Sequence, residues 1–197
     1  MNFDRVAPHY RWLERLVFGR ALEQCRAALL SQVAGCARAL CIGDGDGRFT
    51  EVLLNVKPHT GVDVVERSRS MIRLARRRSN ATFFHANALT FTPDDRYDLV
   101  VTHFVLDTFT EAQVEALVRR VRKCAPGGLW LVSEFQPVGR ASRVLIWLMY
   151  RFFRLAAGLR VQSIPDYGAI FAANGFTLEK NWTKWNGFLV SEIWRIR

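Results

Sequence analysis

Three glycines that alternate with other residues directly follow a short apolar run, and this feature constrains the fold most. The run at residues 37–42 has the composition of a buried strand, and Gly43, Gly45 and Gly47 come after it. Glycine lets the backbone turn tightly and approach a ligand closely. The spacing differs from the Gly-x-Gly-x-x-Gly spacing of dinucleotide-binding loops. A structural tight turn also explains such a loop, so its meaning depends on the segments around it.

Strand and helix signals alternate along the chain. Apolar runs predict further strands at residues 61–66, 82–85, 97–104 and 129–135. Helical spacing predicts helices at residues 11–33, 68–78, 111–125, 140–159 and 166–174, with a short one after the glycine loop. The Asn186-Gly187 pair predicts a hairpin between residues 176–185 and 188–197. We therefore expect an α/β fold with a doubly wound, mostly parallel seven-stranded sheet and a C-terminal antiparallel hairpin.

Several polar residues follow the expected strands, where doubly wound sheets bind their ligands. A carboxylate at the end of the second strand can accept hydrogen bonds from both hydroxyls of a ribose, and Glu66 and Asp63 are the two candidates. Asn87 follows the third strand, and its side-chain carbonyl can accept a hydrogen bond from the adenine amine. The neighbouring Ala88 can offer a backbone N–H to a ring nitrogen. His103 stands at the end of the fourth strand and is expected at the same crevice.

The order of these segments resembles the class I S-adenosylmethionine (SAM)-dependent methyltransferases, of the broad type that includes ubiquinone and menaquinone C-methyltransferases. Residues 40–49 are similar to the SAM loop of that family, and Asn87-Ala88 to its Asp-Ala pair. Residues 66–76 (ERSRSMIRLAR) match its pattern acid-x-Ser-x-x-Met-x-x-x-Ala-Arg. The resemblance selects Glu66 as the ribose acid and implies that Arg67 and Met71 lie beside the cofactor.

The resemblance also implies the architecture and the cofactor. We expect one Rossmann-like domain over residues 1–197, SAM as methyl donor and S-adenosylhomocysteine as product. Residues 3–10 resemble the family's opening segment, so residues 1–35 are expected to form a helical lid that brings Tyr10 to the cofactor. Residues 136–175 are expected to form a helical insertion on the acceptor side. In the family an Asp often stands where this chain has Cys41, and our hypothesis is that Asp44 or Asp46 replaces it.

His103 is the candidate general base or orienting group for the methyl acceptor. Asp107 is placed to orient His103, or to cap the helix that follows. A His packed beside Phe104 in a purely structural role is the alternative. No pattern typical of a catalytic metal site accompanies these residues, and the four cysteines lack the spacing of a zinc site or a disulfide framework.

The net charge of the chain indicates which kinds of partner it could bind. The sequence has 28 Lys and Arg residues against 18 Asp and Glu residues, a net charge of +10. Such an excess favours nucleic acid, an anionic membrane surface or an acidic ligand, and a solvated Arg-rich surface explains it equally well. No segment reads as a signal peptide or a membrane span, so a cytoplasmic location is expected.

The expected helix at residues 140–159 is basic and amphipathic. Its basic side carries Arg140, Arg143, Arg151 and Arg154, with Trp147 among them. Its apolar side carries Leu145, Leu148, Met149, Phe152, Leu155 and Ala156. Such a helix can make peripheral contact with an anionic membrane. The alternative is a helix packed on its own sheet with its basic side in solvent.

These observations predict a SAM-dependent methyltransferase that methylates O or C of a small lipophilic or aromatic acceptor. A non-catalytic SAM-binding or scaffold protein is the main alternative. An RNA methyltransferase is disfavoured, because the chain lacks an Asn/Asp-Pro-Pro-aromatic motif for flipped bases and a separate recognition domain. A nicotinamide-dependent oxidoreductase is disfavoured by the glycine spacing.

Overall fold

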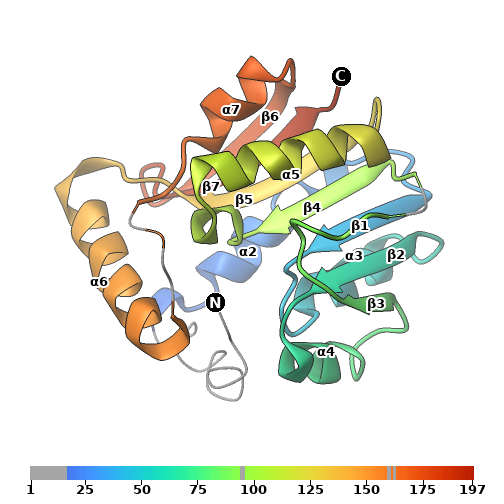
Figure 1. Ribbon diagram of the computed structural model, residues 1–197, viewed down its shortest axis with the longest axis horizontal. Helices are drawn as coiled ribbons and strands as arrows, with labels where there is room; N and C mark the ends of the chain where they lie inside the picture. Colours follow the sequence, from blue (N-terminus) through green and yellow to red (C-terminus); the bar gives the residue numbers. More distant parts are fainter. Residues whose placement is uncertain (1–16, 94–95, 159–160, 162) are drawn as a thin grey trace.

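A twisted seven-stranded sheet forms the centre of the molecule (Figure 1). The computed structural model describes residues 17–93, 96–158, 161 and 163–197. The strands are β1 (Arg38–Ile42), β2 (Gly61–Glu66), β3 (Thr82–His85), β4 (Leu99–His103), β5 (Leu129–Phe135), β6 (Thr177–Lys184) and β7 (Leu189–Arg195). Their order is β3-β2-β1-β4-β5-β7-β6, with β1 to β5 parallel and β7 antiparallel to both neighbours. The predicted doubly wound sheet is confirmed.

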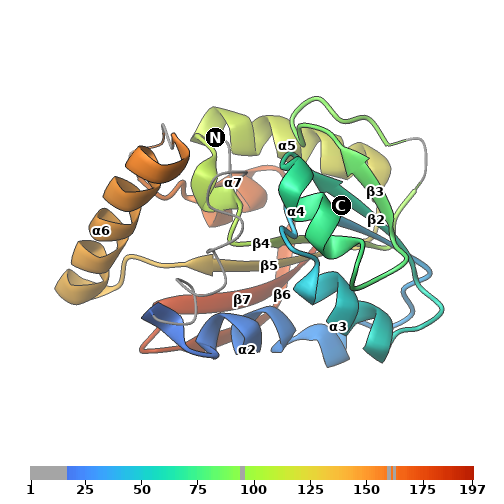
Figure 2. The ribbon, with the colours of Figure 1, turned by 90° about the horizontal axis from the view of Figure 1, so that it is seen from below.

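Helices cover both faces of this sheet, as expected when parallel strands are joined by helical crossovers. They are α2 (Ala21–Ala27), α3 (Arg48–Val56), α4 (Arg69–Ala75), α5 (Glu111–Cys124), α6 (Gly139–Ala157) and α7 (Tyr167–Ala173). The helices α5 and α7 pack on one face, and α2 and α3 on the other (Figures 1 and 2). The helix α6 lies beyond the carboxyl ends of the parallel strands, where Ile146 and Tyr150 pack in one cluster with residues of α2 and β5. Among the described residues, no helix is both long and apolar enough to span a bilayer.

Local signals account for several element boundaries. Asn186 and Gly187 adopt φ angles of 52° and 87°, and the Phe188 N–H donates to the Trp185 carbonyl at 3.1 Å, so the predicted hairpin turn is confirmed. Ser68 caps α4 as predicted, since its hydroxyl accepts the Met71 N–H at 3.2 Å.

The predicted continuous helix over residues 11–33 is wrong in its described part. Gly19 takes a left-handed φ of 57°, which a helix interior does not accommodate, and α2 begins only at Ala21. After α2 the chain makes a 3-10 turn, Leu30–Gln32, which buries Leu29 and Leu30 against the sheet. Tyr10 and most of the predicted lid lie outside the described residues.

Two glycines of the loop after β1 are required by close packing. A Cβ on Gly43 (φ 70°) would lie 2.6 Å from Cγ2 of Val105, and one on Gly47 (φ 81°) would lie 2.6 Å from Cβ of Ala75. Gly47 also begins α3, so this glycine lets α3 and α4 approach each other. Gly45 has a φ of 65°, but a Cβ there meets nothing within 4 Å.

We expect Gly47→Ala to lower the free energy of unfolding by about 3 kcal/mol, because the new methyl group overlaps the backbone of α4 and the residue stays left-handed. Gly45→Ala is the matched control and should cost about 1 kcal/mol, for the left-handed conformation alone. Urea unfolding of the two variants measures the difference. Equal losses would contradict the packing role of Gly47.

Candidate functional site

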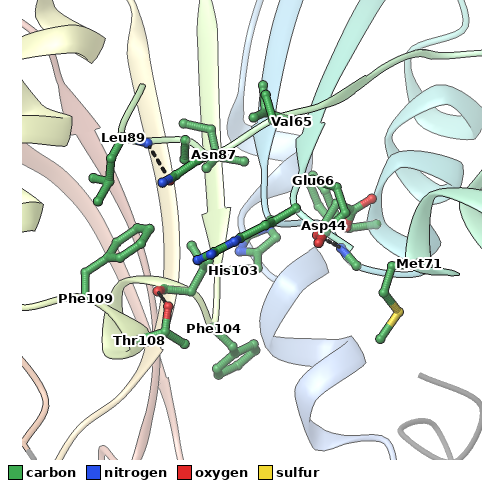
Figure 3. Close-up of a pocket in the computed structure, with 18 of the residues that line it drawn as sticks. Asp44, Val65, Glu66, Met71, Asn87, Leu89, His103, Phe104, Thr108 and Phe109 are labelled. Atoms are coloured by element: carbon green, nitrogen blue, oxygen red, sulfur yellow. Dashed lines mark hydrogen bonds between the residues drawn. The ribbon is translucent and has the colours of Figure 1, made fainter. Parts of the chain in front are cut away.

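A cavity of about 750 Å³ opens at the carboxyl ends of the parallel strands, where the strand order reverses between β1 and β4. Ten predicted residues line it: Gly43, Asp44, Gly45, Asp46, Glu66, Arg67, Met71, Asn87, Ala88 and His103. In the view of Figure 3, Asp44, Glu66 and Met71 lie on one side of the cavity and Thr108 and Phe109 on the other, with His103 between them. Gly47 and Asp107 are not among the described lining residues. The roles given to these residues stay predictions.

Glu66 ends β2 and joins two neighbouring segments. Its Oε1 accepts the Ser68 N–H at 2.7 Å and its Oε2 accepts the Gly45 N–H at 3.2 Å. The Arg67 N–H also interacts with this carboxylate, which keeps acceptor capacity for a ligand hydroxyl. The other candidate, Asp63, accepts from the Arg38 guanidinium and the Tyr97 hydroxyl at 2.8 Å each and does not line the cavity. The geometry therefore favours Glu66.

Asp44 and Asp46, the two acids of the glycine loop after β1, have different interaction partners. Asp44 accepts hydrogen bonds from the backbone N–H and the hydroxyl of Thr50, at 3.0 and 2.6 Å, and burial raises its pKa to about 6. Asp46 instead forms ion pairs with Arg48 at 2.9 Å and Arg78 at 3.4 Å. Because two guanidinium groups already balance Asp46, Asp44 is the better candidate for a cationic ligand group.

The wall next to β3 is mainly apolar. Asn87 accepts the Leu89 N–H through Oδ1 at 3.0 Å, which stabilises the turn and uses part of its acceptor capacity. A second lone pair on that oxygen remains for a ligand. The surrounding surface comes from Ile42, Val65, Met71, Ala86, Ala88 and Leu89. A flat aromatic base fits such a wall.

His103 is the last residue of β4 and is 6% exposed. The ring packs against Phe49 with the two centroids 4.3 Å apart. Neither ring nitrogen has a hydrogen-bond partner among the described residues. Burial, assisted by the nearby charge of Arg26, lowers the pKa of His103 well below its usual value. The imidazole is therefore neutral at neutral pH, and His103 forms part of the cavity wall with both ring nitrogens buried.

Asp107 does not orient His103 as predicted, nor does it cap α5. Its Oδ1 lacks a hydrogen-bond partner among the described residues, and the cap of α5 is Thr110. Asp107 instead lies near Glu134 and raises the pKa of that buried carboxyl further, beyond the effect of burial. Burial also raises the pKa of Asp107 itself to about 7. The pair can lower its electrostatic cost by keeping a proton.

Sequence reasoning missed Glu134, which binds the turn that follows β4. Its Oε1 accepts the N–H groups of Val105 and Leu106 at 2.9 and 2.7 Å. These bonds fix the turn that leads to Thr108 and Phe109 on the cavity wall. An acid inside the apolar strand at residues 129–135 was the signal that could have pointed to it.

Arg26 and Phe104 also line the cavity and were not predicted. The Arg26 guanidinium lies 5.2 Å from the centroid of the Phe104 ring, a cation–π distance. Phe104 has a φ of 55°, which a non-glycine residue seldom adopts and which is typical of functional sites. Nothing in the local sequence indicates that α2 would bring Arg26 to this edge of the sheet.

Comparisons with known proteins agree with this geometry. Residues 39–128 match the family described as "Methyltransferase domain". A demethylmenaquinone methyltransferase of Thermus thermophilus is 31% identical over 75% of this chain and 70% of its own length. A malonyl-[acyl-carrier protein] O-methyltransferase of Bacillus cytotoxicus is 29% identical over 68% of this chain, which spans 48% of that protein. The structure of the N-methyltransferase NodS of Bradyrhizobium japonicum with S-adenosylhomocysteine superposes with a TM-score of 0.65 at 20% identity, over 91% of this chain and 87% of that one.

The chain therefore belongs to the class I SAM-dependent methyltransferases. Its fold is the Rossmann-like fold of that class, and SAM is the methyl donor. The cavity fits this cofactor, because it combines a buried carboxylate with spare acceptor capacity, a glycine loop and an apolar wall.

We expect the affinity for S-adenosylhomocysteine to rise about tenfold from pH 5 to pH 7.5, because Asp44, with a pKa of about 6, must ionise to attract the ligand's ammonium group. Asp44→Asn should remove most of this dependence, whereas Asp46→Asn should keep it. Titration calorimetry across the pH range measures the affinities. Loss of the dependence in Asp46→Asn instead would assign the role to Asp46.

The buried carboxyl pair predicts a pH dependence of stability. The pKa of Asp107 lies above its unfolded value of 3.8, so the folded state holds more protons between about pH 4 and pH 7. The free energy of unfolding should therefore fall as the pH rises through this window. Asp107→Asn should reduce that fall, and the exposed Glu111→Gln should not. Urea unfolding at several pH values tests this; equal slopes in wild type and Asp107→Asn would contradict it.

Proposed function

We propose that this enzyme transfers the methyl group of SAM to an oxygen or carbon atom of a small lipophilic or aromatic acceptor. The observation that supports this is the character of the cavity around His103. Phe104, Phe109 and Val161 are among the lining residues, and in Figure 3 Phe109 lies across the cavity from Glu66. An aromatic or lipophilic molecule loses water favourably against such a wall.

The chain's residues act chiefly by positioning. SAM supplies an electrophilic methyl group when it is bound. Glu66 would hold the nucleoside end of SAM and Asp44 its amino-acid end. The apolar wall excludes water from the space where the acceptor approaches. Orientation and exclusion of water are the main contributions that a transfer of this kind needs from a protein.

His103 accepts the acceptor's proton in this proposal. As the new bond to the methyl carbon forms, a hydroxyl oxygen gains positive charge and its proton becomes strongly acidic. An imidazole with a lowered pKa is a weak base, but it is neutral at physiological pH and can take such a proton. The absence of a hydrogen-bond partner on its ring nitrogens among the described residues leaves it available for that step.

We expect His103→Ala to lower kcat by about a hundredfold or more, as removal of a general base does, while the affinity for S-adenosylhomocysteine changes less than about threefold. The assay follows the labelled methyl group of SAM with a naphthoquinol, a catechol and a short dicarboxylate as acceptors. Label should enter the two aromatic acceptors, and added imidazole should partly restore the variant. The exposed His59→Ala is the control.

Two outcomes would contradict this proposal. Transfer only to the dicarboxylate, or only to added RNA, would overturn the acceptor class. An unchanged kcat in His103→Ala with an aromatic acceptor would remove His103 from the chemistry.

A further inference from the structure

The helix α6 has two apolar stripes, of which the protein covers only one. Ser142, Ile146 and Tyr150 are buried against the body of the molecule. The second stripe stays exposed at Val144 (57%), Leu148 (52%), Phe152 (41%) and Leu155 (85%). The predicted apolar face carried Leu145, Leu148, Met149, Phe152, Leu155 and Ala156. The structure divides them, because Leu145 and Met149 pack inward while Leu148, Phe152 and Leu155 face solvent.

A row of arginines runs beside the exposed stripe. Arg140, Arg143, Arg151 and Arg154 are exposed, and at 3.6 residues per turn they lie about a quarter turn from it. Trp147 is 57% exposed in the same row, and the Arg151 guanidinium lies 5.4 Å from its ring centroid. The sequence of α6 contains no acidic residue. We call the arginine row and the apolar stripe together the outer face of α6.

We propose that the outer face of α6 docks this enzyme on the surface of an anionic lipid membrane. The apolar stripe would enter the boundary between headgroups and acyl chains, and the guanidinium groups would bind lipid phosphates. Tryptophan is enriched at that depth of a bilayer. Lipid headgroups also match the uniform positive charge of the face, because each phosphate is an acceptor for an arginine.

A second copy of the chain fits this face poorly. In a symmetric dimer the same patch contacts itself, so the arginine rows of two copies would meet without any acid on α6 to balance them. Such like-charge contact opposes association, whereas an anionic lipid surface is attracted to the same residues.

The position of α6 connects the docked surface to the cavity. The helix lies beyond the carboxyl ends of the strands (Figure 1), and Gly158 and Val161, which follow it, line the cavity. Docking would therefore bring this end of the cavity close to the membrane. Entry of a lipophilic acceptor from the bilayer rests on the proposed function, but docking itself does not.

Co-sedimentation with vesicles tests the docking without any methyl acceptor. We expect the protein to bind vesicles of phosphatidylcholine mixed with phosphatidylglycerol, and to bind pure phosphatidylcholine vesicles at least tenfold more weakly. High ionic strength should weaken binding to the mixed vesicles. The double variant Arg143→Ala/Arg154→Ala should lower the affinity for the mixed vesicles at least tenfold, because each arginine lost near the surface costs about fivefold in affinity. Leu148→Ser/Leu155→Ser should lower it by a similar factor, because it removes the inserted apolar groups.

Matched controls separate docking from general charge and from misfolding. Arg119→Ala/Arg122→Ala removes two exposed charges from α5, and Leu178→Ser removes an exposed apolar side chain from β6. Both controls should bind vesicles as the wild type does. All variants should keep the thermal melting temperature and the affinity for S-adenosylhomocysteine, since these residues lie outside the described lining of the cavity.

Three results would overturn the proposal. The first is that the wild type does not bind the mixed vesicles, and the second is that it binds both vesicle types equally. The third is that the α5 control and the α6 arginine variant lose the same amount of vesicle affinity. Self-association that the α6 variants abolish, without vesicle binding, would assign the face to a second copy instead. A failed methylation assay bears only on the proposed function, because vesicle binding needs no turnover.

Discussion

The site depends on one buried carboxylate that joins segments far apart in the chain. Glu66 ends β2, and its two oxygens accept N–H groups from Gly45 after β1 and from Ser68 at the start of α4. The same region requires Gly47, because α3 and α4 approach so closely there that no side chain fits. The loop, the strand end and the helix start are therefore held together by this one side chain. Burial raises the pKa of Glu66, and the hydrogen bonds that it accepts oppose this rise by stabilising the charged carboxylate.

The parts of the fold that the sequence predicted are those set by local chemistry. Asn186-Gly187 tolerates positive φ, and Ser68 offers a capping oxygen, so hairpin and helix start could be located from neighbouring residues alone. The break at Gly19 was missed, because helical periodicity continues across it and only packing against the sheet favours the turn after α2. Periodicity likewise could not tell which apolar stripe of α6 would be covered.

The site was predictable where topology alone decides it. Residues that follow parallel strands meet at the switch in strand order, which brought Glu66, Asn87 and His103 to one cavity. Long-range contacts decided the rest. Arg26 reaches the cavity because α2 packs across the sheet, and Asp107 lies near Glu134 because Glu134 binds the turn that contains Asp107. Residues that lie so far apart in the sequence form no local spacing pattern from which their contact could be predicted.

The turn beside the buried carboxyl pair also links α6 to the cavity wall. The Tyr150 hydroxyl, on the packed face of α6, donates to the Asp107 carbonyl at 2.9 Å, and Glu134 holds the preceding N–H groups of the same turn. Thr108 and Phe109 continue from this turn into the cavity wall. A displacement of α6 would therefore strain the hydrogen bonds that fix this wall. The packed face of α6 is thus tied, through the Tyr150 hydroxyl, to the turn that leads into the cavity wall.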